Sequence, residues 1–132
     1  MKYMLDTNII IYAKNNRPEE VLQRFRQYEP EDLCVSAITM AELEYGICNS
    51  SKPGQNRLAL LTFLSGIEVM PFDAGAAREY GKIRFELKQN GEMIGGNDLL
   101  IAAHAKALKL VLITNNAKEF ERIKGLKTKN WV

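Results

Sequence analysis

Four carboxylate side chains occupy comparable places in the sequence, each next to the start or end of a predicted strand or helix. They are Asp6, Glu42, Asp98 and Glu119. Asp6 follows an apolar run that predicts a buried strand, and Glu119 lies just beyond another predicted strand. Glu42 falls in the first predicted turn of one helix, and Asp98 begins another. Because ligands bind outside the carboxyl ends of parallel strands, all four could meet at one edge of a sheet.

Four carboxylates at one edge would need a cation or a shared proton. Two like charges ~4 Å apart repel by about 4 kcal/mol at an effective dielectric constant near 20. Oxygen ligands that keep water favour Mg²⁺, with Mn²⁺ as the alternative, over zinc. Each acid also has a purely structural interpretation. Asp6 could cap a helix, Glu42 could close a capping box with Thr39, Asp98 could favour a helix start, and Glu119 could be a solvated charge.

The elements that would position these acids alternate between strands and helices. Strands are predicted around Leu5 and at 33–35, 68–72 and 110–114. Two helices are expected to start at Pro18 and at a capping box at 39–42, and a third carries Leu58, Leu61 and Leu64. Two more are expected from an Asp73 cap to Gly91 and over 99–108. Polar loops are expected at 14–17 and 50–55. This order predicts an α/β sandwich, with a mostly parallel central sheet flanked by helices on both faces.

Length and composition limit the class of protein. A chain of 132 residues predicts one domain over 1–132, and a net charge of +2 permits nucleic-acid binding without requiring it. Cys34 and Cys48 match no metal-binding spacing, so we expect buried free thiols in a reducing compartment. Asp6 and Asn8 interrupt the first apolar run too early for a signal peptide, and no run is long enough to span a membrane. The sequence therefore predicts a cytoplasmic protein.

The ordered motifs together resemble a known family. They are residues 4–9, residues 36–46 with Ala41-Glu42-Leu43, Gly96-Asn97-Asp98 at the start of an alanine-rich helix, and residues 112–116 followed by Glu119-Phe120. This set is similar to a PIN domain, and more narrowly to the VapC toxin ribonucleases of bacterial VapBC toxin-antitoxin pairs. The resemblance implies metal ligation by Asp6 and Asp98, with Glu42 completing an acidic triad. Many PIN domains place a fourth acid near Asn116 or Glu119, so that position stays open between the two.

The resemblance also implies a function and partners. It implies an Mg²⁺-dependent endoribonuclease that cuts RNA of the translation apparatus, with tRNA, and the anticodon region of initiator tRNA first, as the favoured substrate. A VapB-type antitoxin would wrap the toxin and send a basic side chain into the acidic pocket. The toxin would form a homodimer within a larger complex that contacts DNA only through the antitoxin.

Several other residues are assigned supporting or structural roles. Neutral hydrogen-bonding side chains suited to holding the acids are Thr7, Asn8, Thr114 and Asn116. Candidates for phosphate contacts, with a plain solvated surface as the alternative, are Lys118, Arg122, Lys124, Lys127 and Lys129. We expect His104 and Trp131 to be structural.

Two other classes of protein remain alternatives at this point. A phosphotransferase of the haloacid dehalogenase type needs a second Asp where this chain has Asn8, which disfavours it. The other alternative is a noncatalytic interaction module in which the acids only cap helices.

Overall fold

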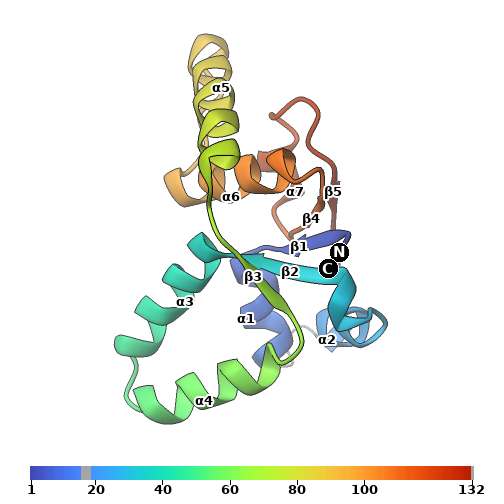
Figure 1. Cartoon of the computed structure of the whole chain (residues 1–132), viewed down its shortest axis with the longest axis vertical. Helices are drawn as coiled ribbons and strands as arrows, with labels where there is room; N and C mark the ends of the chain where they lie inside the picture. The colour runs from blue at the N-terminus through green and yellow to red at the C-terminus, as the bar shows by residue number, and fades with distance from the viewer. Residues whose placement is uncertain (16–18, 132) are drawn as a thin grey trace.

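A single parallel sheet forms the centre of the computed structural model, which describes residues 1–15 and 19–131 (Figure 1). Its five strands run in the order β3-β2-β1-β4-β5. Their bounds are β1 Tyr3–Leu5, β2 Leu33–Ser36, β3 Glu68–Met70, β4 Val111–Ile113 and β5 Thr128–Lys129. All four neighbouring pairs are parallel, so the carboxyl ends of the strands share one edge. The predicted α/β class is confirmed.

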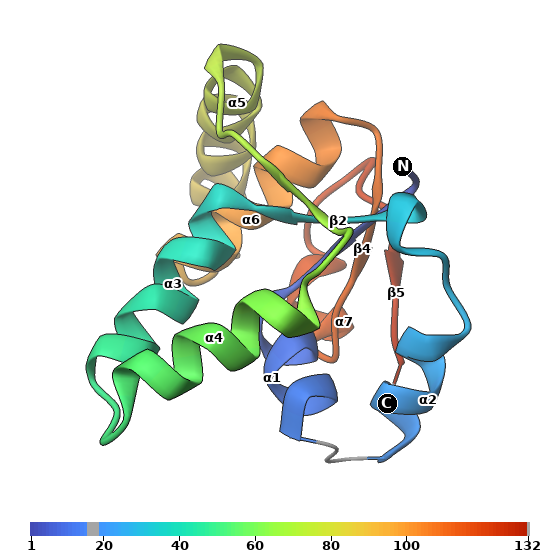
Figure 2. The same ribbon diagram turned by 60° about the horizontal axis from the view of Figure 1, so that its bottom comes forward.

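Helices cover both faces of this sheet (Figures 1 and 2). Their bounds are α1 Thr7–Asn15, α2 Glu19–Arg26, the short 3₁₀ helix Pro30–Asp32, α3 Ala37–Cys48, α4 Pro53–Phe63, α5 Ala74–Asn90, α6 Gly96–Ala107 and α7 Ala117–Phe120. Met4 belongs to the core shared with α5, α6 and α7, whereas its neighbour Leu5 belongs to the core shared with α1 to α4. Alternate residues of β1 thus bury side chains on opposite faces. No helix among the described residues is long and apolar enough to cross a membrane.

The helix that carries Glu42 begins earlier than predicted. Ser36, at the end of β2, is the N-cap of α3, and its hydroxyl accepts a hydrogen bond from the amide of Ile38 at 3.0 Å. The capping box predicted for Thr39 and Glu42 is therefore wrong, because both residues lie inside the helix. Glu42 consequently sits in the second turn of α3 rather than the first, and its carboxylate is not needed as a cap.

The next helix also starts before its predicted position. Pro53 is the first residue of α4, so the loop predicted at 50–55 is shorter than expected. The apolar face is rotated as well, because Leu60 and Leu64 are buried while Leu58 is 67% and Leu61 55% exposed. These two leucines do not pack against the core. Packing within this chain therefore does not explain why such large apolar side chains stand here.

Other local expectations have mixed outcomes. Asp73 caps α5 through the amide of Ala76 at 3.0 Å, and Gly91 ends that helix at φ 66°, as predicted. The loop expected at 14–17 is wrong at Lys14 and Asn15, which are the last two residues of α1. Its remaining part, like the helix start expected at Pro18, extends into residues 16–18, outside the described residues.

The two cysteines differ in exposure. Cys34 is buried, but Cys48 is exposed, which corrects the expectation that both thiols are buried.

Candidate active site

Asp6 is held at the carboxyl end of β1, where the sheet edge meets α1. Its side chain is only 3% exposed. One carboxylate oxygen accepts a hydrogen bond from the Thr114 hydroxyl at 2.9 Å, and the other accepts from the Thr7 amide at 2.8 Å. Thr114 follows β4, the strand beside β1 in the sheet. The two neighbouring strand ends therefore fix one buried carboxylate.

Glu42 reaches the same edge from α3. Its Oε1 atom accepts a hydrogen bond from the Thr7 hydroxyl at 2.6 Å, and its Oε2 atom accepts one from the Asn97 side-chain amide at 3.2 Å. Thr7 thus contacts Asp6 through its amide and Glu42 through its hydroxyl. Asn97 was not predicted to have a role, although it directly precedes Asp98 in the chain. These bonds bring α1, α3 and α6 together around Glu42.

Glu119, on α7, approaches the start of α6. Its Oε1 atom accepts a hydrogen bond from the Gly95 amide at 3.1 Å, and its Oε2 atom accepts one from the Asn116 side chain. A Cβ atom at Gly95 would lie 3.6 Å from Oδ2 of Asp98 and 4.0 Å from Oε1 of Glu119, so both carboxylates lie beside this residue. Asn116 donates a hydrogen bond to the Glu119 carboxylate and has no carboxylate of its own. Of the two residues considered for the fourth position, Glu119 therefore stays the candidate acid and Asn116 its hydrogen-bond donor.

The acids influence one another electrostatically. The pKa of Asp98 is raised from 3.8 to about 6, chiefly by burial and in addition by the charges of Asp6, Glu119 and Glu42. Burial also raises the pKa of Asp6, against the opposing hydrogen bonds from Thr114 and Thr7. The structure thus gathers like charges at one place, and a bound cation would relieve their repulsion.

The donor set fits a hard divalent cation that keeps much of its water. Within the described parts of the chain, no three His, Cys, Asp or Glu side chains are grouped so that they could hold a metal ion together. Mg²⁺ often takes only one or two carboxylates from a protein and retains several waters. Asp6, which is buried, and Asp98, which is half-buried, are candidates for such a pair, because the charge of Asp6 raises the pKa of Asp98 and the two carboxylates are therefore close.

Other predicted residues lie outside this cluster. Asn8 is exposed on the first turn of α1. Glu44, two positions after Glu42 on the same helix, is turned away from the cluster and forms an ion pair with Arg57 at 3.2 Å. His104 is buried, with Nδ1 2.8 Å from the Ser36 hydroxyl, and Trp131 is buried against Tyr28. His104 and Trp131 are therefore packed in the interior, as expected from the sequence.

The sheet order and the acids at its carboxyl edge agree with the comparison with known families. Residues 3–126 match the family described as the PIN domain, so the chain belongs to the PIN-domain family. Within that family it belongs with the VapC ribonucleases. Ribonuclease VapC2 of Haemophilus influenzae is 46% identical over 132 residues, covering 100% of this chain and 99% of that protein.

Two further relatives have informative names. The tRNA(fMet)-specific endonuclease VapC of Shigella flexneri is 42% identical over 131 residues, covering 99% of this chain and 98% of that protein. The crystal structure of DNA-bound VapBC from Salmonella typhimurium matches with a TM-score of 0.93 and 41% identity, covering 100% of this chain and 99% of that chain. The PIN fold expected from the motifs is confirmed.

Proposed function

We propose that this protein is the toxin of a type II toxin-antitoxin pair, and that it cleaves folded RNA of the translation apparatus with Mg²⁺, or with Mn²⁺ as the alternative. One observation carries the proposal. Asp6, Glu42, Asp98 and Glu119 come from four separate segments and gather at the carboxyl edge of the sheet. The names of the relatives support an endoribonuclease. Membership of the PIN family disfavours the phosphotransferase and the noncatalytic module.

The residues divide the chemical work between them. Asp6 and Asp98 would hold the cation, which supplies water of lowered pKa and offsets negative charge that develops on the phosphate. Glu42 would orient and deprotonate the attacking water, since Thr7 and Asn97 hold its two oxygens. Thr114 fixes the Asp6 carboxylate, and Asn116 fixes Glu119. Cleavage would leave a 5′-phosphate and a 3′-hydroxyl.

Initiator tRNA is the favoured substrate. The relatives from Shigella flexneri and Salmonella typhimurium are named tRNA(fMet)-specific endonucleases and are 42% and 41% identical to this chain. A small domain with a net charge of +2 also has little excess charge for unselective binding of long single strands. Shape and scattered basic side chains would then select the RNA.

Mapping the cleaved ends tests this substrate. Antitoxin-free protein is incubated with total RNA and Mg²⁺, and new 5′-phosphate ends are sequenced. We expect one dominant site in the anticodon loop of initiator tRNA, which is lost with EDTA and in the Asp98→Asn variant. A dominant site in another tRNA, in ribosomal RNA or in mRNA would refute the initiator-tRNA assignment, whereas no Mg²⁺-dependent cleavage would refute the nuclease proposal.

A groove beside the acids suits the antitoxin. It lies between α1, α3 and α4 and is lined by the apolar side chains Ile10, Ile11, Leu43, Ile47 and Leu60. Thr7 and Glu42 also line it, so the groove ends at the acidic cluster. A VapB-type antitoxin would place apolar side chains here and direct an Arg to the carboxylates. The exposed Leu58 and Leu61 would extend the apolar surface along α4.

Filling the groove should release the antitoxin. Gly46 lines the groove, and a Cβ atom there would meet nothing within 4 Å, so Gly46→Leu is compatible with the helix while narrowing the groove. We expect antitoxin affinity to fall about tenfold or more, the cost of roughly 1.4 kcal/mol of lost contact. Gly81→Leu on α5, equally unobstructed, is the matched control and should bind normally. Equal affinities in calorimetry would place the antitoxin elsewhere.

The proposal also covers the domain organisation, the cellular location and the assembly of the protein. Residues 1–132 are taken to act as one nuclease domain, placed in the cytoplasm, and to form a homodimer within the toxin-antitoxin complex. DNA would be bound only through the antitoxin; the Salmonella VapBC complex was crystallised bound to DNA. Light scattering should give about twice the 15.0 kDa mass of one chain, and a mass of one chain would refute the dimer.

A further inference from the structure

Three hollows follow one another along the segment 116–127, starting beside the acidic cluster. The first is lined by Asn116, Lys118, Glu119 and Arg122. The second shares Arg122 and is bounded by Lys124 and by α5. The third begins one residue further on, at Gly125, and includes Lys127 with Lys106 and Lys109. We call this surface the basic track, defined by Lys118, Arg122, Lys124, Lys127, Lys106 and Lys109.

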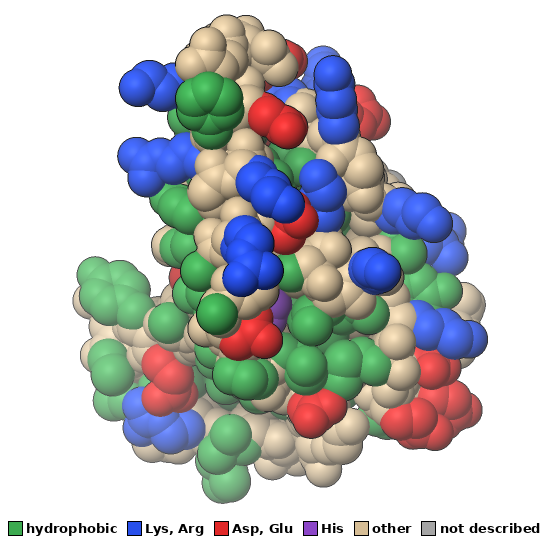
Figure 3. Space-filling model, turned by 45° about the horizontal axis from the view of Figure 1, so that its top comes forward, with side chains coloured by type: hydrophobic (Ala, Val, Ile, Leu, Met, Phe, Trp, Pro, Cys, Tyr) green, Lys and Arg blue, Asp and Glu red, His purple; other side chains and the backbone are tan. Residues whose placement is uncertain are grey.

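Positive charge is concentrated along this surface. The track carries six Lys or Arg, a third of the 18 in the whole chain. Figure 3 shows Lys and Arg predominating on the face that carries α5. Three acids also line the track, and one of them is Glu119 in the first hollow. Glu79 is paired with Lys106 at 3.9 Å, and Glu86 lies in the second hollow. The track therefore remains positively charged overall.

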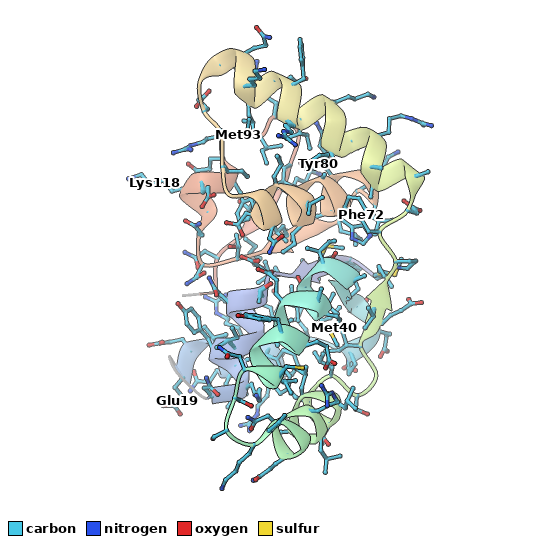
Figure 4. The ribbon with its side chains drawn as sticks, turned by 90° about the vertical axis from the view of Figure 1, so that its left-hand side faces the viewer. Glu19, Met40, Phe72, Tyr80, Met93 and Lys118 are labelled. Atoms are coloured by element: carbon cyan, nitrogen blue, oxygen red, sulfur yellow. The ribbon has the colours of Figure 1, made fainter. Side chains whose placement is uncertain are left out.

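The track is anchored to the start of α6. The Arg122 guanidinium donates hydrogen bonds to the backbone carbonyl of Met93 at 3.1 Å and to that of Glu92 at 3.5 Å. Figure 4 shows Met93 and Lys118 on the same side of the first turn of α6. Because the same segment leads into Gly95 and Asp98, the first hollow has a fixed position relative to the acidic cluster.

An exposed aromatic ring lies in the second hollow. Phe85 lines this hollow on α5 and is 62% exposed, although it is a large apolar side chain. Aromatic rings next to basic side chains are typical of surfaces that hold single-stranded nucleic acid, since the ring stacks on a base while the cations contact phosphates. The combination favours a nucleic acid over an acidic protein as the occupant.

We propose that the basic track holds the strand of the RNA substrate that continues from the scissile phosphate, by contacts to its phosphates and by stacking of one base on Phe85. This inference rests on the proposed ribonuclease function. It favours RNA over DNA because the track starts at Glu119, beside the acids where the scissile bond would lie. The track would contribute to KM and to the choice of RNA, and not to the chemical step.

The salt dependence of KM tests the track. The double variant Lys124→Gln with Lys127→Gln removes two cations from exposed side chains. Each phosphate contact to a single strand changes the slope of log affinity against log salt concentration by about 0.7, so we expect the slope to fall by about 1.4. KM at 0.15 M salt should rise about tenfold, and kcat should not change. Phe85→Ala should also raise KM, and Phe85→Tyr should restore it.

A matched double variant provides the control. Arg26→Gln with Lys52→Gln removes two exposed cations elsewhere on the chain and should leave the slope unchanged. An unchanged slope and KM in the track variant would overturn the inference while the nuclease stands. If the wild type cleaves no RNA, the proposed function fails. The dissociation constant for initiator tRNA is then measured against salt concentration, with the track substitutions placed in the Asp98→Asn protein. If the track variant shows a reduced salt slope only for binding to duplex DNA and not for RNA, the inference would also be overturned.

Discussion

Asp98→Asn should reduce RNA cleavage by at least about 10³-fold, because it removes one of the two carboxylates proposed to hold the cation. The chain should stay folded. Asp98 is half-buried at the start of α6, and Asn is accepted in a first helical turn. Asp6→Asn should abolish cleavage too, but it is the less clean test, because both Asp6 oxygens accept hydrogen bonds from Thr114 and Thr7.

The same substitution should change the pH dependence of stability. The pKa of Asp98 is raised from 3.8 to about 6 in the folded protein, so the folded state binds this proton more tightly than the unfolded chain. The resulting stability is fully present below pH 3.8 and is lost as the pH rises through 6. Because the carboxyl is only half-buried, solvent screening limits the effect to about 1 kcal/mol.

Urea unfolding in EDTA at several pH values measures this effect. The free energy of unfolding of the wild type should fall between pH 4 and 6, whereas the Asp98→Asn protein should show a smaller fall and be slightly more stable at pH 7. Added Mg²⁺ should stabilise the wild type and not the variant. Asp73→Asn is the matched control, since Asp73 also begins a helix and Asn caps equally well. An Asp98→Asn protein that cleaves RNA at close to the wild-type rate would refute the metal assignment.

The position of the acids was predictable because it follows from chain order. Asp6 and Thr114 each come directly after a strand whose apolar residues mark it, and parallel pairing places such residues at one edge. The exact helix starts were not predictable. Ser36 and Thr39 both carry a hydroxyl that can cap a helix. Ser36 is the cap because β2 ends at this residue and α3 begins at the next one. The predicted apolar face of α4 was wrong for a related reason, since local spacing did not show which leucines meet the core.

Contacts between distant segments were also beyond local patterns. The bond from the Gly95 amide to Glu119 joins residues 24 positions apart, and the bond from Asn97 to Glu42 joins residues 55 apart. Periodicity describes the face of one element and says nothing about which loop packs against it. The only local signal for Asn97 was its place beside Asp98 in the chain. The role of Glu119 at this edge depends on α7, a helix of four residues that its short sequence did not predict.

Glu42→Gln should lower kcat by about 10²-fold or more with little change in KM, because a positioned general base contributes about 10²- to 10⁴-fold. Gln has the same shape, and its carbonyl can still accept the Thr7 hydroxyl, so the fold should persist. Glu44→Gln is the control two positions along the same helix, where the carboxylate only pairs with Arg57 at the surface. Its kcat should match the wild type in single-turnover cleavage of initiator tRNA. Near wild-type turnover by Glu42→Gln would mean that Glu42 acts only by accepting the Thr7 hydroxyl, because Gln keeps that acceptor and removes the basicity.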